Sequence, residues 1–183
     1  MPECRISFSL EPFSAIVHLM DGNEEYFMRE ALRQAKKAYA KGEVPVGAVI
    51  VRQDRIVARA YNQVELLKDA TAHAEMLVLT QAQEAVGDWR LTDCKLYVTK
   101  EPCPMCAGAI VHTRLQEVIF GVGDPKAGAA GGAMNLLQHP GLNHSCAIRS
   151  RMLEQESLEL LQSFFRERRA AKGAKATVED AAG

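Results

Sequence analysis

Hydrophobic and polar positions follow a helical period first and a strand-like period afterwards. Between residues 23 and 41 apolar side chains recur at helical spacing, Asn23 can cap this helix, and Gly42 stands where it would stop. The run 46–51 is continuous and β-branched, as in a buried strand, and residues 56–61 form a second strand-like run after a short turn. The pattern predicts a helix followed by a β-hairpin.

The rest of the chain alternates between the two periods. We expect a helix at 73–85 capped by Thr71, a strand at 96–99, a helix at 103–113 with Pro102 at its start, a strand at 118–122 and a final amphipathic helix at 150–169. The segment 63–71 is polar and irregular, and 123–132 is a Gly/Ala-rich loop. Strands that alternate with helices after a hairpin indicate an α/β fold with a mixed sheet.

The two ends of the chain differ from its middle. Residues 1–22 are expected to form a poorly ordered N-terminal extension, with Met20 as an alternative start, and the small, polar tail 170–183 is expected to be disordered. No internal repeat and no linker interrupts residues 23–169, so we predict a single domain there.

Composition narrows the class of protein only modestly. The chain has 183 residues, 48% of them hydrophobic, which is enough for a packed core. Its formal net charge of -1 neither indicates nor excludes a nucleic-acid ligand, because phosphate binding depends on where the charges lie. The apolar runs are too short to span a bilayer, and no clean signal-peptide pattern opens the chain. We therefore expect a cytoplasmic protein without a membrane partner.

Five cysteines with one close pair do not make a disulfide framework. Cys94 and Cys146 lack motif spacing and are expected to be core thiols. Cys103 and Cys106 share one helix face in a first turn, where the helix dipole favours thiolates. This pair alone fits a metal site, a redox pair or two buried thiols.

The sequence His73-Ala-Glu75 changes the interpretation of that pair. One histidine and two cysteines make three ligands, whereas structural zinc sites nearly always have four. Three ligands leave a coordination position for water, so we predict one catalytic Zn²⁺ per chain, held by His73, Cys103 and Cys106. Glu75 is then placed to carry protons between water and a substrate. H-x-E followed by P-C-x-x-C is typical of zinc-dependent nucleobase deaminases.

Longer runs resemble the bacterial tRNA-specific adenosine deaminase family. They are EVPVGAVIV (43–51), TAHAEM (71–76), LYVTKEPCPMCAGAI (96–110), VIFGVGDPKAGAAGG (118–132), HPGLNH (139–144) and FFRERR (164–169). The resemblance implies a three-layer cytidine-deaminase-like fold, a five-stranded mixed sheet flanked by helices, and a homodimer. It also implies that zinc-activated water, with Glu75 as proton shuttle, converts adenosine to inosine at the wobble position of a tRNA anticodon stem-loop.

The same resemblance assigns further site residues by position. Asn62 would hydrogen-bond the extruded adenine. The pocket walls would be Val44, Pro45 and Ala48, and the residues near the RNA would be Asp124, Lys126, His139, Asn143, His144 and Arg166. Lys100 and Gly123 depart from the residues that relatives carry at those positions.

Other functions are compatible with parts of the sequence. Residues 164–175 carry five cations against Glu167, which suits phosphate contact or simply a solvated helix end. The same chemistry would serve a deaminase of free guanine, cytosine or their nucleotides. A zinc-stabilised RNA-binding module without catalysis is an alternative of another class, although such a module has no use for Glu75.

Overall fold

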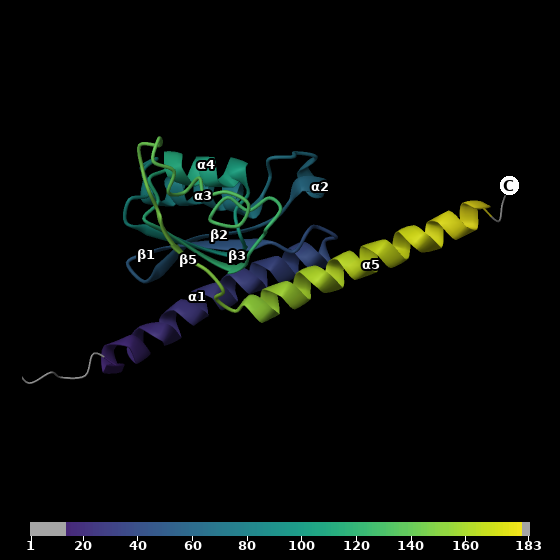
Figure 1. Ribbon diagram of the computed structural model, residues 1–183, viewed down its shortest axis with the longest axis horizontal. Coiled ribbons are helices and arrows are strands. Elements are labelled where there is room, and N and C mark those ends of the chain that lie inside the picture. The colour runs from purple at the N-terminus through teal and green to yellow at the C-terminus, as the bar shows by residue number, and fades with distance from the viewer. Residues whose placement is uncertain (1–13, 181–183) are drawn as a thin grey trace, which may run out of the picture.

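The structure, a computed structural model, describes residues 14–180, and the side chains of residues 23–171. A five-stranded sheet lies between two layers of helices, with α3 and α4 on one face and α1 and α5 on the other (Figure 1). The elements are α1 Ser14–Ala40, β1 Gly47–Arg52, β2 Arg55–Tyr61, α2 Val64–Leu67, α3 Ala74–Val86, β3 Cys94–Lys100, α4 Pro104–His112, β4 Glu117–Val122, β5 Ala147–Arg149 and α5 Glu154–Asp180. The predicted α/β fold is confirmed.

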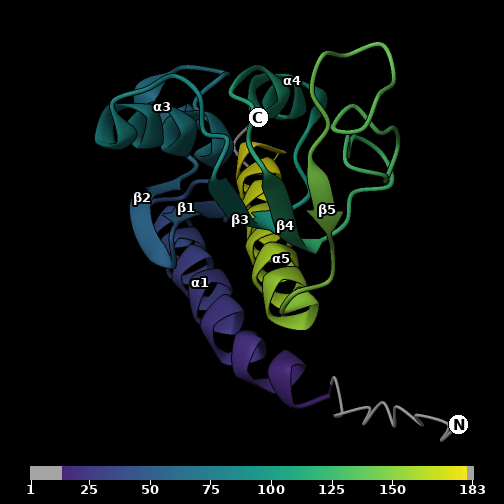
Figure 2. The same cartoon turned by 90° about the vertical axis from the view of Figure 1, so that its left-hand side faces the viewer.

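The sheet has the order β2-β1-β3-β4-β5 and is mixed. β1 pairs antiparallel with β2 and with β3, whereas β3, β4 and β5 run parallel. A parallel neighbour requires a crossover, and α4 makes it between β3 and β4. α3 packs beside α4 on the same face of the sheet (Figure 2).

Both faces of the central strands are buried, so their alternation separates two cores. Val49, Tyr97 and Ile119 face α1, where they pack with Phe27 and Met28. The intervening positions of the same strands pack with Val78 of α3 and Ile110 of α4. These strand residues are Ala48, Ile50, Leu96, Val98, Val118 and Phe120. Strands covered on both sides explain the nearly continuous apolar run of β1.

The sheet and α1 approach each other most closely at Gly47. A Cβ atom at this position would collide with the carbonyl oxygen of Ala31 and the backbone nitrogen of Ala35. The first residue of β1 must therefore be glycine for α1 to reach its place under the strand.

Several predicted boundaries were wrong. α1 begins at Ser14 rather than at Asn23, and α5 continues to Asp180, through an Ala-rich stretch with high helix propensity. Thr71 does not cap α3: its amide and its hydroxyl both donate to Asp69 Oδ1, at 2.8 Å and 2.7 Å, and His73 is the capping residue.

Two short elements were missed and one proline was misplaced. β5 has three residues and no buried position, so it lacks an alternating signal. α2 lies inside the segment expected to be irregular. Pro104, and not Pro102, occupies the first turn of α4, where a missing N–H costs nothing.

The expected core thiols are confirmed, since Cys94 and Cys146 are buried. Residues 1–13 lie outside the described part of the chain, and the division into extension, domain and tail stays a prediction. Within the described residues, no helix combines the length and the hydropathy that a membrane span needs.

Candidate active site

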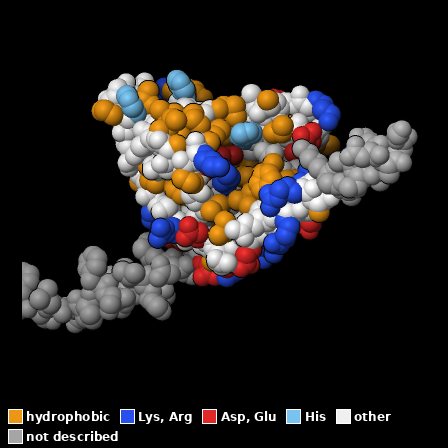
Figure 3. All heavy atoms as spheres, turned by 45° about the vertical axis from the view of Figure 1, so that its right-hand side comes forward, with side chains coloured by type: hydrophobic (Ala, Val, Ile, Leu, Met, Phe, Trp, Pro, Cys, Tyr) orange, Lys and Arg blue, Asp and Glu red, His pale blue; other side chains and the backbone are white. Residues whose placement is uncertain are grey.

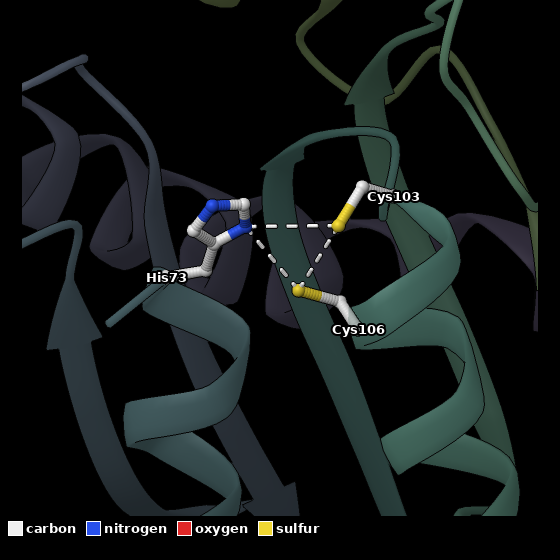
Figure 4. Close-up of side chains that lie close together, drawn as sticks. All are labelled: His73, Cys103 and Cys106. Carbon is white, nitrogen blue, oxygen red and sulfur yellow. Dashed lines mark hydrogen bonds between the residues drawn. The ribbon is translucent and has the colours of Figure 1, made fainter. Parts of the chain in front are cut away.

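Three potential metal ligands meet where two helices begin. His73 is the residue before α3 and Cys103 the residue before α4, both with extended backbone, and Cys106 lies one turn inside α4. Pro102 and Pro104 restrict the backbone on each side of Cys103, which turns the chain sharply from strand to helix. The three side chains converge on one point between the helices (Figure 4).

The distances between the ligand atoms fit a tetrahedral metal. His73 Nδ1 lies 3.7 Å from Cys103 Sγ and 3.5 Å from Cys106 Sγ, and the two sulfurs are 3.6 Å apart. Zinc with bonds of about 2.3 Å to sulfur and about 2.0 Å to nitrogen would require edges of roughly 3.5 to 3.8 Å. Among the described residues, these form the one group of histidine, cysteine and acidic side chains close enough to hold a metal ion. The donor set and its spacing therefore fit zinc, with one coordination position left over.

The thiols of Cys103 and Cys106 lie within hydrogen-bonding distance of each other, with the two sulfurs 3.6 Å apart. The hydrogen bond from Cys106 lowers the pKa of Cys103 to about 3, and the proximity of the Cys103 sulfur raises the pKa of Cys106. Metal binding requires both cysteines as thiolates.

Glu75 lies in the first turn of α3 and is almost completely buried, at 4% exposure. Burial raises the pKa of its carboxyl group, because a charge is poorly solvated there. A buried carboxyl group that gains and loses its proton readily is suited to proton transfer.

Glu75 opens onto a cavity of about 320 Å³ beside the ligands. It is lined by Gly42, Glu43, Val44, Val46, Asn62, Val64, Glu65, His73, Glu75, Lys100, Glu101, Cys103 and Arg168. Figure 3 shows a hollow with hydrophobic side chains, bordered by Lys and Arg side chains on both sides. An apolar cavity with a few convergent polar groups is the usual form of a small-molecule site.

Glu43 organises one wall of this cavity. Its buried carboxylate accepts hydrogen bonds from the amides of Leu66 at 2.7 Å and Glu65 at 3.2 Å, which form the first turn of α2. The same carboxylate accepts the Asn62 side-chain amide at 3.4 Å. Glu43 thus orients Asn62, whose carbonyl oxygen remains for a ligand.

Glu101 organises the opposite wall. Its carboxylate accepts the backbone N–H groups of Asp124 at 2.7 Å, Ala130 at 2.9 Å and Gly132 at 2.8 Å. A Cβ atom at Gly128 would collide with this carboxylate. The Gly/Ala-rich loop 123–132 is therefore wrapped around Glu101.

The predicted pocket residues are only partly brought together. Asn62 and Val44 line the cavity, as do His73, Glu75 and Cys103. Pro45 and Ala48 are buried and do not line it, and Val46 takes that place. Their role as walls around a substrate stays a prediction.

The residues expected near RNA lie outside the cavity. Lys126, His139 and Asn143 are exposed, and Arg166 is exposed on α5 with its guanidinium 3.0 Å from Ser163 Oγ. His144 is half-buried, and its Nε2 lies 2.7 Å from the carbonyl oxygen of Leu115. Asp124 forms an ion pair with Lys100 at 2.5 Å. RNA contacts by these residues are not tested by the structure.

Sequence reasoning did not assign Glu43, Lys100, Glu101 and Arg168 to the site, although all of them line the cavity. Glu43 and Glu101 lie within the sequence runs that resemble the family. Their roles could not be predicted, because they depend on hydrogen bonds to backbone N–H groups that are distant in sequence. Lys100 was noted only as a departure from relatives. The sequence analysis assigned Arg166 to the site and treated Arg168 only as part of the basic segment. In the structure Arg168 lines the cavity, whereas Arg166 does not.

Comparison with known proteins agrees with the class that the fold and site define, a deaminase with a potential metal site. The MafB19-like deaminase family matches residues 22–169. The guanine deaminase of Bacillus subtilis, a solved structure, is 38% identical and superposes with a TM-score of 0.53 over 59% of this chain and 69% of that chain.

Two other relatives are more similar. A tRNA-specific adenosine deaminase of Bacillus subtilis is 52% identical over 151 residues, which cover 82% of this chain and 94% of the relative. A solved chain from studies of A-to-I editing by tRNA:A34 deaminases at the wobble position of transfer RNA is 43% identical, with a TM-score of 0.72, and covers 74% of this chain and 99% of that chain. The chain belongs to the family of tRNA-specific adenosine deaminases.

Proposed function

We propose that the protein hydrolytically deaminates adenosine to inosine at the wobble position of a tRNA anticodon. The observation that carries this proposal is the placement of buried Glu75 beside a three-ligand group, at the wall of a cavity that also presents Asn62. The tRNA substrate is supported by the 52% identical tRNA-specific adenosine deaminase, and the wobble position by the 43% identical chain from studies of tRNA:A34 deaminases.

The residues of this chain divide the chemistry between them. His73, Cys103 and Cys106 would hold Zn²⁺, which when bound activates a water molecule at neutral pH. Glu75 accepts a proton from that water and delivers it to N1 of adenine as the water oxygen adds to C6. Glu75 then transfers the second proton to the departing amine, so that water and adenosine yield inosine and ammonia.

The remaining residues would hold the base and its strand. Asn62, fixed by Glu43, is positioned to bond the edge of an extruded base, and Val44 and Val46 supply apolar walls. Single-stranded loop bases can be extruded for a few kcal/mol. Asp124, Lys126, His139, Asn143, His144 and Arg166 are proposed to contact the anticodon stem-loop. A homodimer and a cytoplasmic location are part of the same proposal.

The experiment is a substrate comparison. Purified protein loaded with zinc is incubated with an anticodon stem-loop carrying adenosine at the wobble position, and inosine is measured by nuclease digestion and chromatography. We expect inosine in the stem-loop at that position alone. Inosine at other positions, or none, would contradict the proposal.

A free-base deaminase is the second candidate, because a guanine deaminase is 38% identical to the chain. Parallel reactions with free guanine, cytosine and adenosine test it. Ammonia released from guanine but not from the stem-loop would favour this candidate. Stem-loop binding without any ammonia release would instead favour a non-catalytic RNA-binding module.

A further inference from the structure

The charges that line the cavity are unevenly distributed. Four acidic residues line it, Glu43, Glu65, Glu75 and Glu101, whereas Lys100 and Arg168 are its lysine and arginine. Backbone N–H groups hold the Glu43 and Glu101 carboxylates in place, so both acidic side chains stay at the walls of the cavity. A polyanionic strand would be repelled by such walls unless cations meet its phosphates.

Lys100 is the last residue of β3 and lies at the edge of the cavity. Its side chain is 29% exposed, and its Nζ lies 2.5 Å from Asp124 Oδ2. The Lys100 ammonium group is therefore partly exposed to solvent and forms an ion pair with the Asp124 carboxylate.

Asp124 does not depend on Lys100 for its position. Its Oδ1 accepts the amides of Lys126 at 3.0 Å and Ala127 at 3.1 Å, and its own amide donates to Glu101 at 2.7 Å. Lys100 can therefore turn from Asp124 toward another anion while the loop stays in place. Arg168 approaches the same cavity from α5 and is exposed.

We propose that Lys100, together with Arg168, binds a phosphate that flanks the nucleotide whose base enters the cavity. This inference rests on the proposed function. A base beside Glu75 leaves its ribose and phosphates at the cavity mouth, where these two cations lie. Phosphate binding would offset the repulsion by the acidic walls and would set the depth to which the base enters.

The test removes one charge and measures salt dependence. Lys100→Met keeps the length of the side chain without the ammonium group, and Lys100→Gln is a second variant. Lys95→Met is the matched control, because Lys95 is on the same strand, is 38% exposed and is also ion-paired, with its Nζ 3.1 Å from Glu117. Stem-loop binding by fluorescence anisotropy and kcat/KM for inosine formation are measured from low to moderate salt.

A lost phosphate contact reduces the slope of log affinity against log salt by about 0.7 to 0.9. We expect this reduction for both Lys100 variants, with binding weakened about tenfold at low salt, and an unchanged slope for Lys95→Met. Lys100→Arg should restore the slope. An equal loss at all salt concentrations would assign Lys100 only the structural bridge to Asp124 and overturn the inference, as would wild-type binding by Lys100→Met.

The two proposals can fail separately. If the wild-type protein binds the stem-loop but forms no inosine, the proposed function is wrong, and the binding slope of Lys100→Met still decides the phosphate contact. If the wild-type protein forms inosine and the Lys100 variants keep its salt slope, the phosphate contact is wrong and the proposed function stands.

Discussion

The carboxyl group of Glu75 lies beside the three metal ligands without being one of them. It belongs to the first turn of α3, one residue after Ala74, and burial raises its pKa. A purely structural metal site would gain nothing from a buried acid at this position. The side chain is therefore the residue on which an enzymatic role depends most directly.

Glu75→Gln should separate metal binding from catalysis. Glutamine preserves the shape of the side chain but cannot carry the proton, so we expect turnover to fall by about 10²- to 10⁴-fold. Zinc content, measured by atomic emission, should stay at the wild-type level. Near wild-type inosine formation by this variant would refute the role of Glu75.

Cys103→Ala should remove the metal. The variant lacks one of three ligands, so we expect zinc content and activity to be lost together. Cys94→Ala is the control, since Cys94 is a buried thiol outside the ligand group. It should lose some stability but retain zinc. Full metal occupancy in Cys103→Ala would mean that the ligand assignment is wrong.

Among the connecting segments, the loop 123–132 owes its order to one carboxylate. Glu101 satisfies three of its backbone N–H groups, and the loop passes so closely that Gly128 has no room for a side chain. This packing connects the wall of the cavity to the segment that follows β4.

Gly128→Ala should destabilise this loop. The added Cβ collides with Glu101, so we expect a loss of about 3 kcal/mol and a decrease in Tm of roughly 6 to 12 °C. Gly123→Ala is the matched control, because its Cβ would lie 3.6 Å from Glu101 Oε2, an ordinary contact. Calorimetry should show a change within about 0.5 kcal/mol for that control. Equal Tm values for the two variants would contradict the packing argument.

Across the whole molecule, an ion-pair network joins elements far apart in sequence. The Arg149 guanidinium of β5 donates two hydrogen bonds of 2.5 Å to Glu24 of α1 and one of 2.6 Å to Glu117 of β4. Lys95 of β3 lies 3.1 Å from Glu117. The network fixes α1 to the three parallel strands at a distance from the cavity.

Stability should depend on pH through Glu24. The hydrogen bonds from Arg149 lower the pKa of Glu24 below its ordinary value of 4.5. A lowered pKa in the folded state means that the contribution is complete above about 4.5 and disappears as the pH falls through the lowered pKa. Glu24→Gln should therefore cost about 1 kcal/mol near neutral pH, given the partly exposed guanidinium, and less as the pH falls.

Urea denaturation at neutral and acidic pH measures this difference. Glu25→Gln is the control, because Glu25 forms an exposed pair with Arg29 at i,i+4 and should contribute little at either pH. A cost for Glu24→Gln that is the same at both pH values would show that its origin is packing and not charge.

The order and type of the long elements could be predicted from sequence, because each is encoded in a local period of apolar residues. The short elements could not. α2 needs the carboxylate of Glu43, which is distant in sequence, and β5 pairs with β4 without an apolar pattern of its own. Thr71 was misassigned as the cap of α3 for a different reason: it bonds to Asp69, two residues away, in a local turn that competes with helix capping.

The sequence by itself determined the chemistry of the site, because ligand type and spacing within His73-Ala-Glu75 and Cys103-Pro-Met-Cys106 are local properties of the chain. Only the tertiary structure decided that the His73 Nδ1 atom lies 3.5 to 3.7 Å from the two cysteine sulfurs, since these distances depend on the crossover that packs α4 beside α3. It also decided which charges face the cavity. Lys100 and Arg168 both line the cavity although β3 and α5 are far apart in sequence, because the fold places the two elements beside it.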